Sequence, residues 1–321
     1  MQILVTGGAG FIGSHLCEKL AGDGHKVTVI DDFSTGRASN LEKLKDSKNF
    51  RLIEGSILNS SQLNPLIEES DYIFHLAAAV GVFNIVNNPI ASLLTNIRGT
   101  ENVLESAVKS GTPVFLTSSS EVYGKNISDS LKEGDDRVLG SPVTLRWSYS
   151  EAKAIDESLA YAYFVERKLE TRIVRFFNTV GPRQLGAYGM VVPRFIKAAI
   201  TNEPITIYGD GNQTRCFAHV FDVVDAVTAI AFADNTIGKV INIGNDFEIS
   251  INDLARKIIS ETGSKSEIIY VPYAEAYGVG FEDMERRVPN IDLIKNLVGW
   301  QPRRDLTTMI SDIATQMRNS S

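Results

Sequence analysis

Short apolar runs rich in β-branched residues alternate with helical patterns through the first 178 residues, and this alternation restricts the possible fold more than any other feature. The runs predict strands at 3–6, 26–30, 50–53, 72–76, 114–117 and 172–177. Between them, apolar residues recur at helical spacing over 13–20, 89–110 and 151–163, with Pro89 near one start and Gly111 at one stop. Strands that alternate with helices form βαβ units, so the sequence predicts an α/β protein with a Rossmann doubly wound parallel sheet.

The pattern changes after residue 178, where connections rich in glycine and proline, 181–183 and 208–211, frame a helical stretch at 192–201. This change predicts a smaller C-terminal α/β lobe. Residues 240–243 have the pattern of another buried strand, which precedes a helical segment at 251–261, so we expect the chain to return to the first sheet. The predicted domains are 1–178 joined by about 219–245, and a discontinuous lobe within 179–321.

Composition and charge narrow the class of protein. The 321 residues are 43% hydrophobic and 22% charged, which is typical of a folded globular chain. The net charge of -7 gives no positive field, and no segment approaches about 18 consecutive apolar residues, so we expect neither a nucleic-acid nor a membrane partner. Cys17 and Cys216 are too few for a disulfide framework and neighbour no His cluster, so we expect no metal and a cytoplasmic protein.

A glycine-rich segment follows the first predicted strand and opens a helix, as a dinucleotide-binding turn requires. There the glycines let the backbone approach a pyrophosphate, whose charge the free N–H groups of the helix receive. The cofactor-binding residues that this segment predicts are Gly7, Gly10, Phe11, Ile12 and Gly13. Asp31 lies at the end of the second strand, where a carboxylate binds a ribose 2′-hydroxyl. With Asp32 it repels a 2′-phosphate, so the predicted cofactor is NAD; a purely structural glycine turn is the alternative.

A serine-rich segment, 118–124, follows the strand at 114–117, at the sheet edge where open α/β sheets bind ligands. Further on, Tyr149 and Lys153 are four residues apart and share one face of a helix. An ammonium group there lowers the pKa of the phenol and supports it as a general base. A solvated helix pair is the alternative for this spacing alone.

Together these residues resemble the extended short-chain dehydrogenase/reductases, the group of nucleotide-sugar epimerases, dehydratases and decarboxylases. The resemblance covers essentially the whole chain. It implies that the Rossmann domain holds NAD and that the C-terminal lobe holds a UDP-sugar. It also implies that Ser119 hydrogen-bonds the sugar 4-hydroxyl, Tyr149 removes its proton and Lys153 holds the nicotinamide ribose. Hydride transfer from C4 then gives a 4-keto sugar.

Glu121 separates the members of this group. Simple 4-epimerases usually carry alanine, serine or threonine at its position, and 4,6-dehydratases place Asp-Glu before Val-Tyr-Gly. Here Ser120 replaces that Asp, and Ser-Glu-Val-Tyr-Gly is instead similar to the UDP-glucuronate decarboxylases. The segment 146–149 resembles the Arg-Trp before the catalytic Tyr of the aminoarabinose-pathway decarboxylase. Residues 277–289 resemble its C-terminal segment, although that enzyme has a Tyr at the position of Phe281.

The matching arginine of that segment is catalytic, and its role carries over to Arg287. Once C4 is a ketone, the C6 carboxylate of a glucuronyl sugar lies β to a carbonyl and leaves as carbon dioxide, with the enolate stabilised by nearby donors. Glu121 and Arg287 are expected to manage the carboxylate, the enolate and protonation of C5; a rim carboxylate and a surface salt bridge are the alternatives. The predicted catalytic residues are Ser119, Ser120, Glu121, Tyr149, Lys153 and Arg287.

The region that grips the nucleotide diphosphate resembles the group in two further segments, 178–183 and 214–217. An arginine suits a diphosphate because its planar fork donates hydrogen bonds in pairs. Arg183 is either a further contact or a surface charge, Cys216 is expected to be a small buried residue, and His75 a satisfied structural histidine near the cofactor. The predicted substrate-binding residues are Ser119, Tyr149, Asn178, Arg215 and Arg287.

The preferred function is therefore a UDP-glucuronate decarboxylase. Its close alternative is a UDP-sugar 4-epimerase acting on UDP-glucose or UDP-glucuronate, and a less favoured alternative is a non-catalytic NAD-binding sensor. The helices at 89–110 and 151–163 resemble the pair that makes a four-helix dimer contact in this group, so a homodimer is expected.

Overall fold

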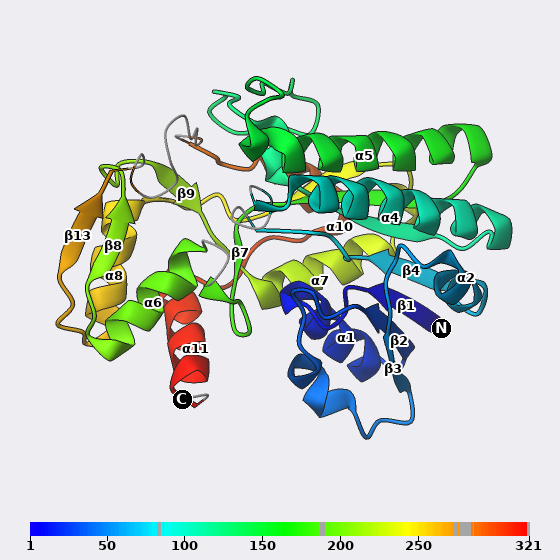
Figure 1. The fold of residues 1–321 in the computed structure, drawn as a ribbon, viewed down its shortest axis with the longest axis horizontal. Helices are drawn as coiled ribbons and strands as arrows, with labels where there is room; N and C mark the ends of the chain where they lie inside the picture. Colours follow the sequence, from blue (N-terminus) through cyan, green and yellow to red (C-terminus); the bar gives the residue numbers. More distant parts are fainter. Residues whose placement is uncertain are drawn as a thin grey trace.

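The computed structural model describes residues 1–81, 85, 87–186, 190–272, 275, 284 and 286–319. Its central feature is a parallel sheet of seven strands in the order β11-β6-β5-β4-β1-β2-β3 (Figure 1). The strands are β1 Gln2–Thr6, β2 Lys26–Asp31, β3 Phe50–Glu54, β4 Tyr72–His75, β5 Val114–Ser119, β6 Thr171–Phe176 and β11 Val240–Ile243. This sheet confirms the predicted doubly wound α/β fold, and the strand predicted at 240–243 pairs with β6, as expected from its apolar sequence.

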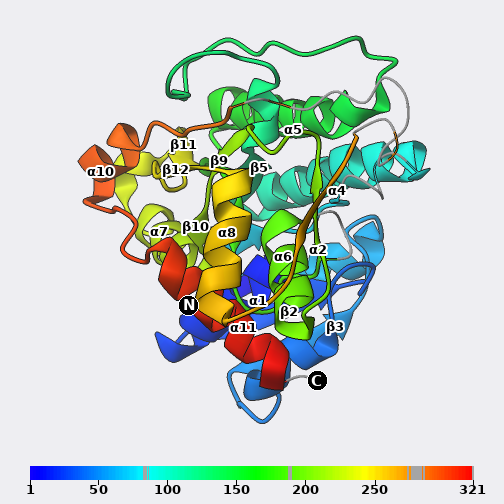
Figure 2. The same cartoon turned by 90° about the vertical axis from the view of Figure 1, so that its left-hand side faces the viewer.

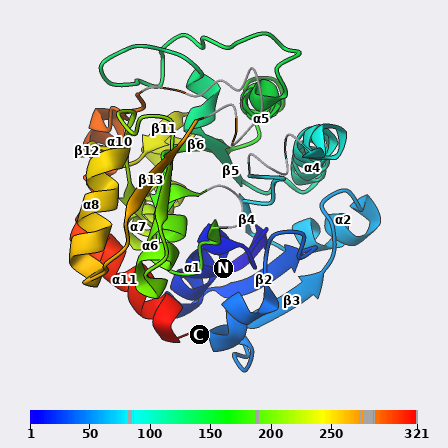
Figure 3. The ribbon, with the colours of Figure 1, turned by 60° about the vertical axis from the view of Figure 1, so that its left-hand side comes forward.

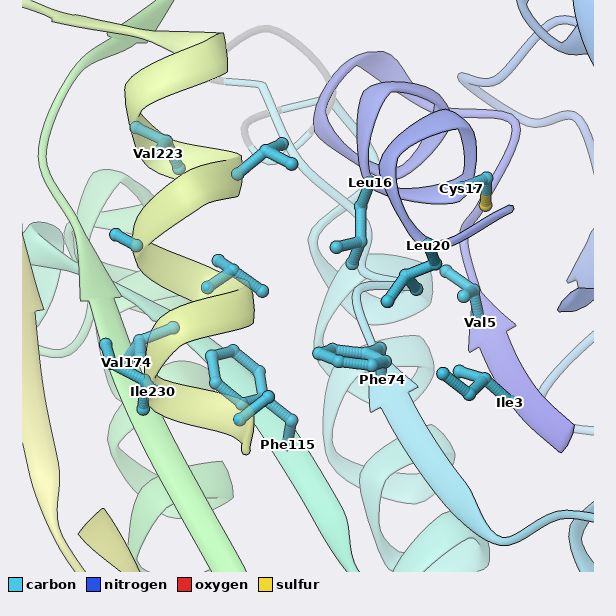
Figure 4. Close-up of a cluster of buried hydrophobic side chains, with 14 of the residues drawn as sticks. Ile3, Val5, Leu16, Cys17, Leu20, Phe74, Phe115, Val174, Val223 and Ile230 are labelled. Atoms are coloured by element: carbon cyan, nitrogen blue, oxygen red, sulfur yellow. The ribbon is translucent and has the colours of Figure 1, made fainter. Parts of the chain in front are cut away.

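Helices cover both faces of this sheet, and Figure 3 shows them on its two sides. On one face lie α1 Phe11–Gly22 and α7 Val220–Ala231. Figure 4 shows Leu16 and Leu20 of α1 next to Phe74 of the sheet, and Ile230 of α7 next to Val174, all of them buried in one cluster. On the other face lie α2 Ser60–Glu68, α4 Pro89–Ser110 and α5 Ser148–Arg167. The sheet is thus buried on both faces, which explains why its strands are continuously apolar.

The sequence marks the two ends of α4 clearly. Pro89 stands in its first turn, where a missing N–H costs no hydrogen bond, and Gly111 ends it in the left-handed conformation at φ 71°. The predicted helix at 89–110 is therefore confirmed to the residue. Helices at the positions of α2 and α7 were not predicted, although the polar residues Asp222, Asp225 and Thr228 of α7 recur every three residues among its apolar ones.

The second half of the chain forms a smaller group of helices and two-stranded sheets, seen on the left of Figure 1 and toward the viewer in Figure 2. Its helices, α6 Val191–Thr201, α8 Ile251–Thr262 and α11 Leu306–Asn319, share one buried apolar cluster. Its sheets pair β8 Ile205–Tyr208 with β13 Ile268–Val271, β7 Thr179–Val180 with β10 Ala218–His219, and β9 Thr214–Cys216 with β12 Glu248–Ser250. These elements confirm the predicted C-terminal α/β lobe.

The chain passes back and forth between the two parts. After β10, α7 and β11 pack on the first sheet, and α8 then returns to the second cluster. The helix α10 Asp292–Val298 also packs on the first cluster, where Trp300 donates from Nε1 to the Asp222 carbonyl at 3.0 Å. The exact domain boundaries remain a prediction.

Short 3-10 helices complete the described chain: η1 Ala38–Leu44, η2 Ser120–Tyr123, η3 Leu145–Trp147 and η5 Asp234–Thr236. Two of them, η2 and η3, carry residues of the site. Within the described part of the chain, no helix combines the length and the apolar character needed to cross a membrane.

Candidate active site

A cavity of about 930 Å³ lies at the carboxyl ends of β1, β2, β4, β5 and β6 and extends toward α6 and β9. This is the edge at which open α/β sheets bind ligands. Every residue predicted for catalysis, cofactor or substrate lines it: Gly7, Gly10, Phe11, Ile12, Gly13, Asp31, Asp32, Ser119, Ser120, Glu121, Tyr149, Lys153, Asn178, Arg215 and Arg287. The fold therefore brings together residues that are up to 280 positions apart in the sequence.

The glycine turn packs too tightly to accept side chains. Gly7 has φ 71°, and a Cβ there would lie 2.6 Å from the Ala77 nitrogen, while a Cβ on Gly13 would collide with the Gly7 carbonyl oxygen. Gly10 is the N-cap of α1, and no side chain caps that helix end. Uncapped N–H groups at a helix N-terminus that lines a cavity are suited to a pyrophosphate.

Asp31 ends β2 inside this cavity and is held by two backbone donors. Its Oδ2 accepts from the Ala9 nitrogen and its Oδ1 from the Phe33 nitrogen, both at 2.9 Å. Burial raises the pKa of this carboxyl, and those two hydrogen bonds oppose the rise. A carboxylate has about four acceptor positions, so two backbone bonds leave Asp31 able to accept a ribose hydroxyl. The turn and Asp31 together fit an NAD molecule.

Tyr149 and Ser119 meet where β5 ends beside the first turn of α5. The Ser119 hydroxyl accepts from the Glu121 nitrogen at 3.2 Å and also hydrogen-bonds the Tyr149 side chain. Burial raises the pKa of Tyr149, and the negative charges of Glu121 and Asp156 raise it further, whereas the bond to Ser119 lowers it.

The expected lowering of the Tyr149 pKa by Lys153 is wrong for this structure. The Lys153 ammonium instead donates to Asp156 Oδ2 at 3.1 Å, and both side chains are buried. The ammonium charge is thus balanced by Asp156 one turn along the same helix. Sequence reasoning missed Asp156, although its spacing of three residues from Lys153 is a signal for an ion pair on a helix.

Glu121 is clamped between two buried arginines. Its Oε2 accepts from Arg146 Nη1 and its Oε1 from Arg287 Nη1, both at 2.6 Å. Arg287 Nη1 also donates to Ser120 Oγ at 3.2 Å. Burial alone would raise the pKa of Glu121, but the two guanidinium charges outweigh it and hold that pKa well below its usual range. Glu121 is therefore a carboxylate at any working pH, and neither a rim carboxylate nor a surface salt bridge describes it.

Three chain segments converge to build this clamp. Glu121 comes from η2, Arg146 from η3 and Arg287 from the segment before α10, which is fixed where the Leu131 nitrogen donates to the Val288 carbonyl at 2.8 Å. Most of the segment at 277–289, Phe281 included, lies outside the described residues. Arg146 was expected only as part of the resemblance at 146–149, and its contact with Glu121 is seen only in the structure.

The far end of the cavity holds the residues predicted to grip the diphosphate. Asn178 Nδ2 donates to the Cys216 carbonyl at 2.9 Å, and buried Arg215 donates from Nη1 to the Thr214 carbonyl at 2.8 Å. Cys216 is a buried free thiol whose pKa burial raises to about 12, as expected for a packing residue. Other polar residues that line this end, and that the sequence analysis did not single out, are Gln184, Arg194, Tyr208 and Gln213.

Arg183 and His75 have structural partners. Arg183 donates to Ser14 Oγ at 3.1 Å and pairs with Glu18 of α1 at 2.5 Å, and it does not belong to the cavity lining. The His75 ring lies between the hydroxyls of Thr6, at 2.7 Å, and Thr100, at 3.2 Å. Arg183 therefore has a structural role and is not a contact in the cavity, and His75 is a structural histidine, as expected.

Comparison with known proteins agrees with the fold and shows the family of this chain. The model of the NAD dependent epimerase/dehydratase family matches residues 3–244. The chain belongs to this family and is an NAD-dependent enzyme. The resemblance to the extended short-chain dehydrogenase/reductases that the motifs indicated is confirmed.

Particular relatives narrow the comparison. The chain is 41% identical over 302 residues to UDP-N-acetyl-alpha-D-glucosaminuronate decarboxylase of Bacillus cytotoxicus, which covers 94% of this chain and 92% of that protein. It is likewise 41% identical over 302 residues to UDP-glucuronic acid decarboxylase 1 of Xenopus tropicalis, over 94% of this chain and 68% of that one. Among solved structures, UDP-glucuronic acid 4-epimerase of Bacillus cereus, in complex with UDP-glucuronic acid and NAD, has a TM-score of 0.89 at 29% identity and covers 100% of both chains.

Proposed function

We propose that this protein is an NAD-dependent UDP-glucuronate decarboxylase that acts through a 4-keto intermediate. The observation that carries the proposal is the Arg287–Glu121 ion pair, 2.6 Å long, in the cavity that also holds Ser119 and Tyr149. A sugar with a carboxylate at C6 needs a cation beside its reacting end, and Arg287 is such a cation. Two relatives 41% identical to this chain bear the names of uronate decarboxylases, which supports the same substrate class.

The first step removes a hydride from C4 of the sugar and a proton from its 4-hydroxyl. Bound NAD supplies the hydride acceptor and a cationic nicotinamide ring, whose charge opposes the effects of Glu121 and Asp156 on the Tyr149 pKa. Gly10 and the first turn of α1 would hold its pyrophosphate, and Asp31 and Lys153 its riboses. Tyr149 Oη takes the proton of the 4-hydroxyl, and Ser119 Oγ orients that hydroxyl by a hydrogen bond.

The second step breaks the bond between C5 and C6. Its electron pair passes toward the C4 carbonyl and forms an enolate, carbon dioxide leaves, and a proton from water is added at C5, because the ionised Glu121 has none to donate. Arg287 and Ser120 Oγ, which are hydrogen-bonded to each other at 3.2 Å, are placed to receive the carboxylate and then the enolate oxygen. Asn178 and Arg215 bind the diphosphate at the other end of the cavity.

The test is a proton NMR time course of the enzyme with UDP-glucuronate and NAD, followed in parallel by the absorbance of reduced nicotinamide. We expect loss of carbon dioxide, with steady absorbance if the product is UDP-xylose and rising absorbance if a 4-keto pentose is released. UDP-N-acetylglucosaminuronate is run beside it, because one relative bears that sugar in its name. Absence of carbon dioxide with both uronates would refute the proposal.

A 4-epimerase is the second candidate, and one observation favours it. The UDP-glucuronic acid 4-epimerase of Bacillus cereus has the same fold over 100% of both chains. In that case the 4-keto sugar would rotate in the cavity after oxidation, and C4 would take back the hydride on its opposite face. Formation of UDP-galacturonate in the same NMR experiment would establish this reaction instead.

From the family resemblance of these two helices we also propose a homodimer formed by α4 and α5. These two helices pack side by side on one face of the sheet and carry exposed apolar side chains. Ile90 and Leu94 share one face of α4 and are 74% and 38% exposed, and Tyr161 and Val165 share one face of α5. A second copy of the chain would cover them.

A further inference from the structure

We propose that Arg146 is a positioning residue for the decarboxylation: it fixes the Glu121 carboxylate so that Oε1 faces Arg287. The inference deepens the proposed function and rests on it. Arg146 is separate from the predicted catalytic set, and its guanidinium is buried within the same cavity.

The geometry of Glu121 shows why a second arginine matters. A carboxylate with one partner rotates about its terminal torsion, because such sp³–sp² torsions are broad and weakly restricted. Glu121 has one arginine on each oxygen, at 2.6 Å on either side, so neither oxygen is able to turn away. The position of Oε1 then sets the position of Arg287, which is the cation proposed to meet the sugar carboxylate.

Arg146 is itself held firmly. Its guanidinium lies 5.4 Å from the centre of the Trp147 ring, and that ring is fully buried. Both residues belong to η3, which leads directly into α5 and hence to Tyr149. Ser150 Oγ donates to the Glu121 carbonyl at 2.7 Å and ties the same helix to η2. Arg146 therefore links the group that oxidises C4 to the group that handles C6.

Charge gives Arg146 a second effect through Glu121. The charged and titratable groups recorded around that carboxylate are Arg146 from η3, Arg287 from the segment before α10 and Tyr149 from α5. Without Arg146, one of the two opposing positive charges is lost, so the pKa of the partly buried Glu121 carboxyl is expected to rise. A protonated Glu121 no longer pairs with Arg287 as an anion, so activity would fall as the pH is lowered.

The experiment compares Arg146→Gln, Arg146→Lys, Glu121→Gln and the double variant Glu121→Gln/Arg146→Gln. Arg137→Gln is the matched control, because Arg137 also connects η2 to α5 but does not line the cavity. It donates to the Val122 carbonyl of η2 at 3.1 Å and to Glu151 of α5 at 3.3 Å. Carbon dioxide release from UDP-glucuronate gives kcat and KM from pH 5 to pH 9.

We expect Arg146→Gln to lower kcat by about 100-fold with little change in KM, since misplacement of a reacting group costs this much. The kcat of Arg146→Gln should also fall as the pH is lowered. The wild type should show no such fall, and Arg146→Lys only a small one, because lysine keeps the positive charge. In the Glu121→Gln background the same change should cost no more than about threefold, because its effect passes through Glu121.

Three outcomes would overturn the inference. These are equal losses of kcat in Arg146→Gln and Arg137→Gln, the same loss in both Glu121 backgrounds, or no fall in the kcat of Arg146→Gln as the pH is lowered. Failure of the proposed function looks different, because the wild type itself would then release no carbon dioxide. The inference about decarboxylation would fail with it.

Discussion

Individual residues in this protein take their chemical properties from burial and from a few fixed partners. Glu121 is kept ionised by two arginines, while Tyr149 lies near two carboxylates that hold its proton more tightly. Lys153 lies along the same helix but donates to Asp156. The acid–base behaviour of the site is therefore a property of the group of residues and not of the Tyr149–Lys153 pair alone.

Tyr149→Phe is predicted to abolish oxidation of the sugar. The change removes the hydroxyl proposed to take the proton of the 4-hydroxyl, and loss of a general base typically costs about 100- to 10,000-fold in rate. The measurement is single-turnover formation of reduced nicotinamide with UDP-glucuronate. Titration of the variant with NAD is the control and should match the wild type; undiminished turnover would contradict the mechanism.

Stability is predicted to fall in acid partly because of His75. Burial lowers the pKa of His75 to about 3, from an ordinary value near 6.5, so the unfolded chain binds a proton that the folded chain does not. Stability from this residue is therefore complete above pH 6.5 and is lost as the pH falls toward 3, by about 1.4 kcal/mol per pH unit. Urea unfolding of His75→Gln between pH 7 and pH 4.5 should show a slope smaller by that amount, and an unchanged slope would contradict it.

At the scale of elements, short local signals fix where helices end. Gly111 ends α4 at φ 71°, and a Cβ there would meet nothing within 4 Å, so only the backbone conformation requires glycine. Gly22 ends α1 without a positive φ and is also surrounded by open space. The two positions therefore separate the conformational role of glycine from packing.

These two glycines give opposite predictions. Gly111→Ala should lower the free energy of unfolding by about 1 kcal/mol, because an L side chain is strained in the left-handed region. Gly22→Ala should raise it by about 0.5–1 kcal/mol, because alanine restricts the unfolded chain without strain in the helix. Chemical denaturation of both variants measures the difference, and a shift of the same sign in both would be inconsistent with this account.

At the scale of the whole molecule, the cavity exists because the chain crosses between its two parts several times. Along the chain, α6 and β8 belong to the second part, whereas α7 and β11, which follow them, pack on and extend the first sheet. The Arg183–Glu18 pair also joins the loop after β7 to α1. The residues proposed to bind the two ends of the substrate therefore reach the same cavity from different parts of the chain.

The proposed homodimer is also a property of the whole molecule. Tyr161, 51% exposed on α5, should lie in its interface, so Tyr161→Glu is predicted to shift the protein from dimer to monomer in sedimentation velocity. Phe247→Glu, which changes a residue that is 64% exposed on the other part of the molecule, is the control and should leave the dimer intact. A wild-type monomer at micromolar concentration would contradict the proposal.

The sequence alone determined the strands of the seven-stranded sheet and most helices of the first half, because a buried parallel strand, a proline at a helix start and a glycine turn are each set by neighbours in the chain. The glycine turn, Asp31, Tyr149 and Lys153 were also found from local patterns, whereas Arg287 was found only from the resemblance to a known family. The tertiary structure decided the partners of Glu121, which lies between Arg146 and Arg287. An ion pair between residues 121 and 287 depends on how distant segments pack, and burial then sets the strength of its charges, so no local pattern encodes it.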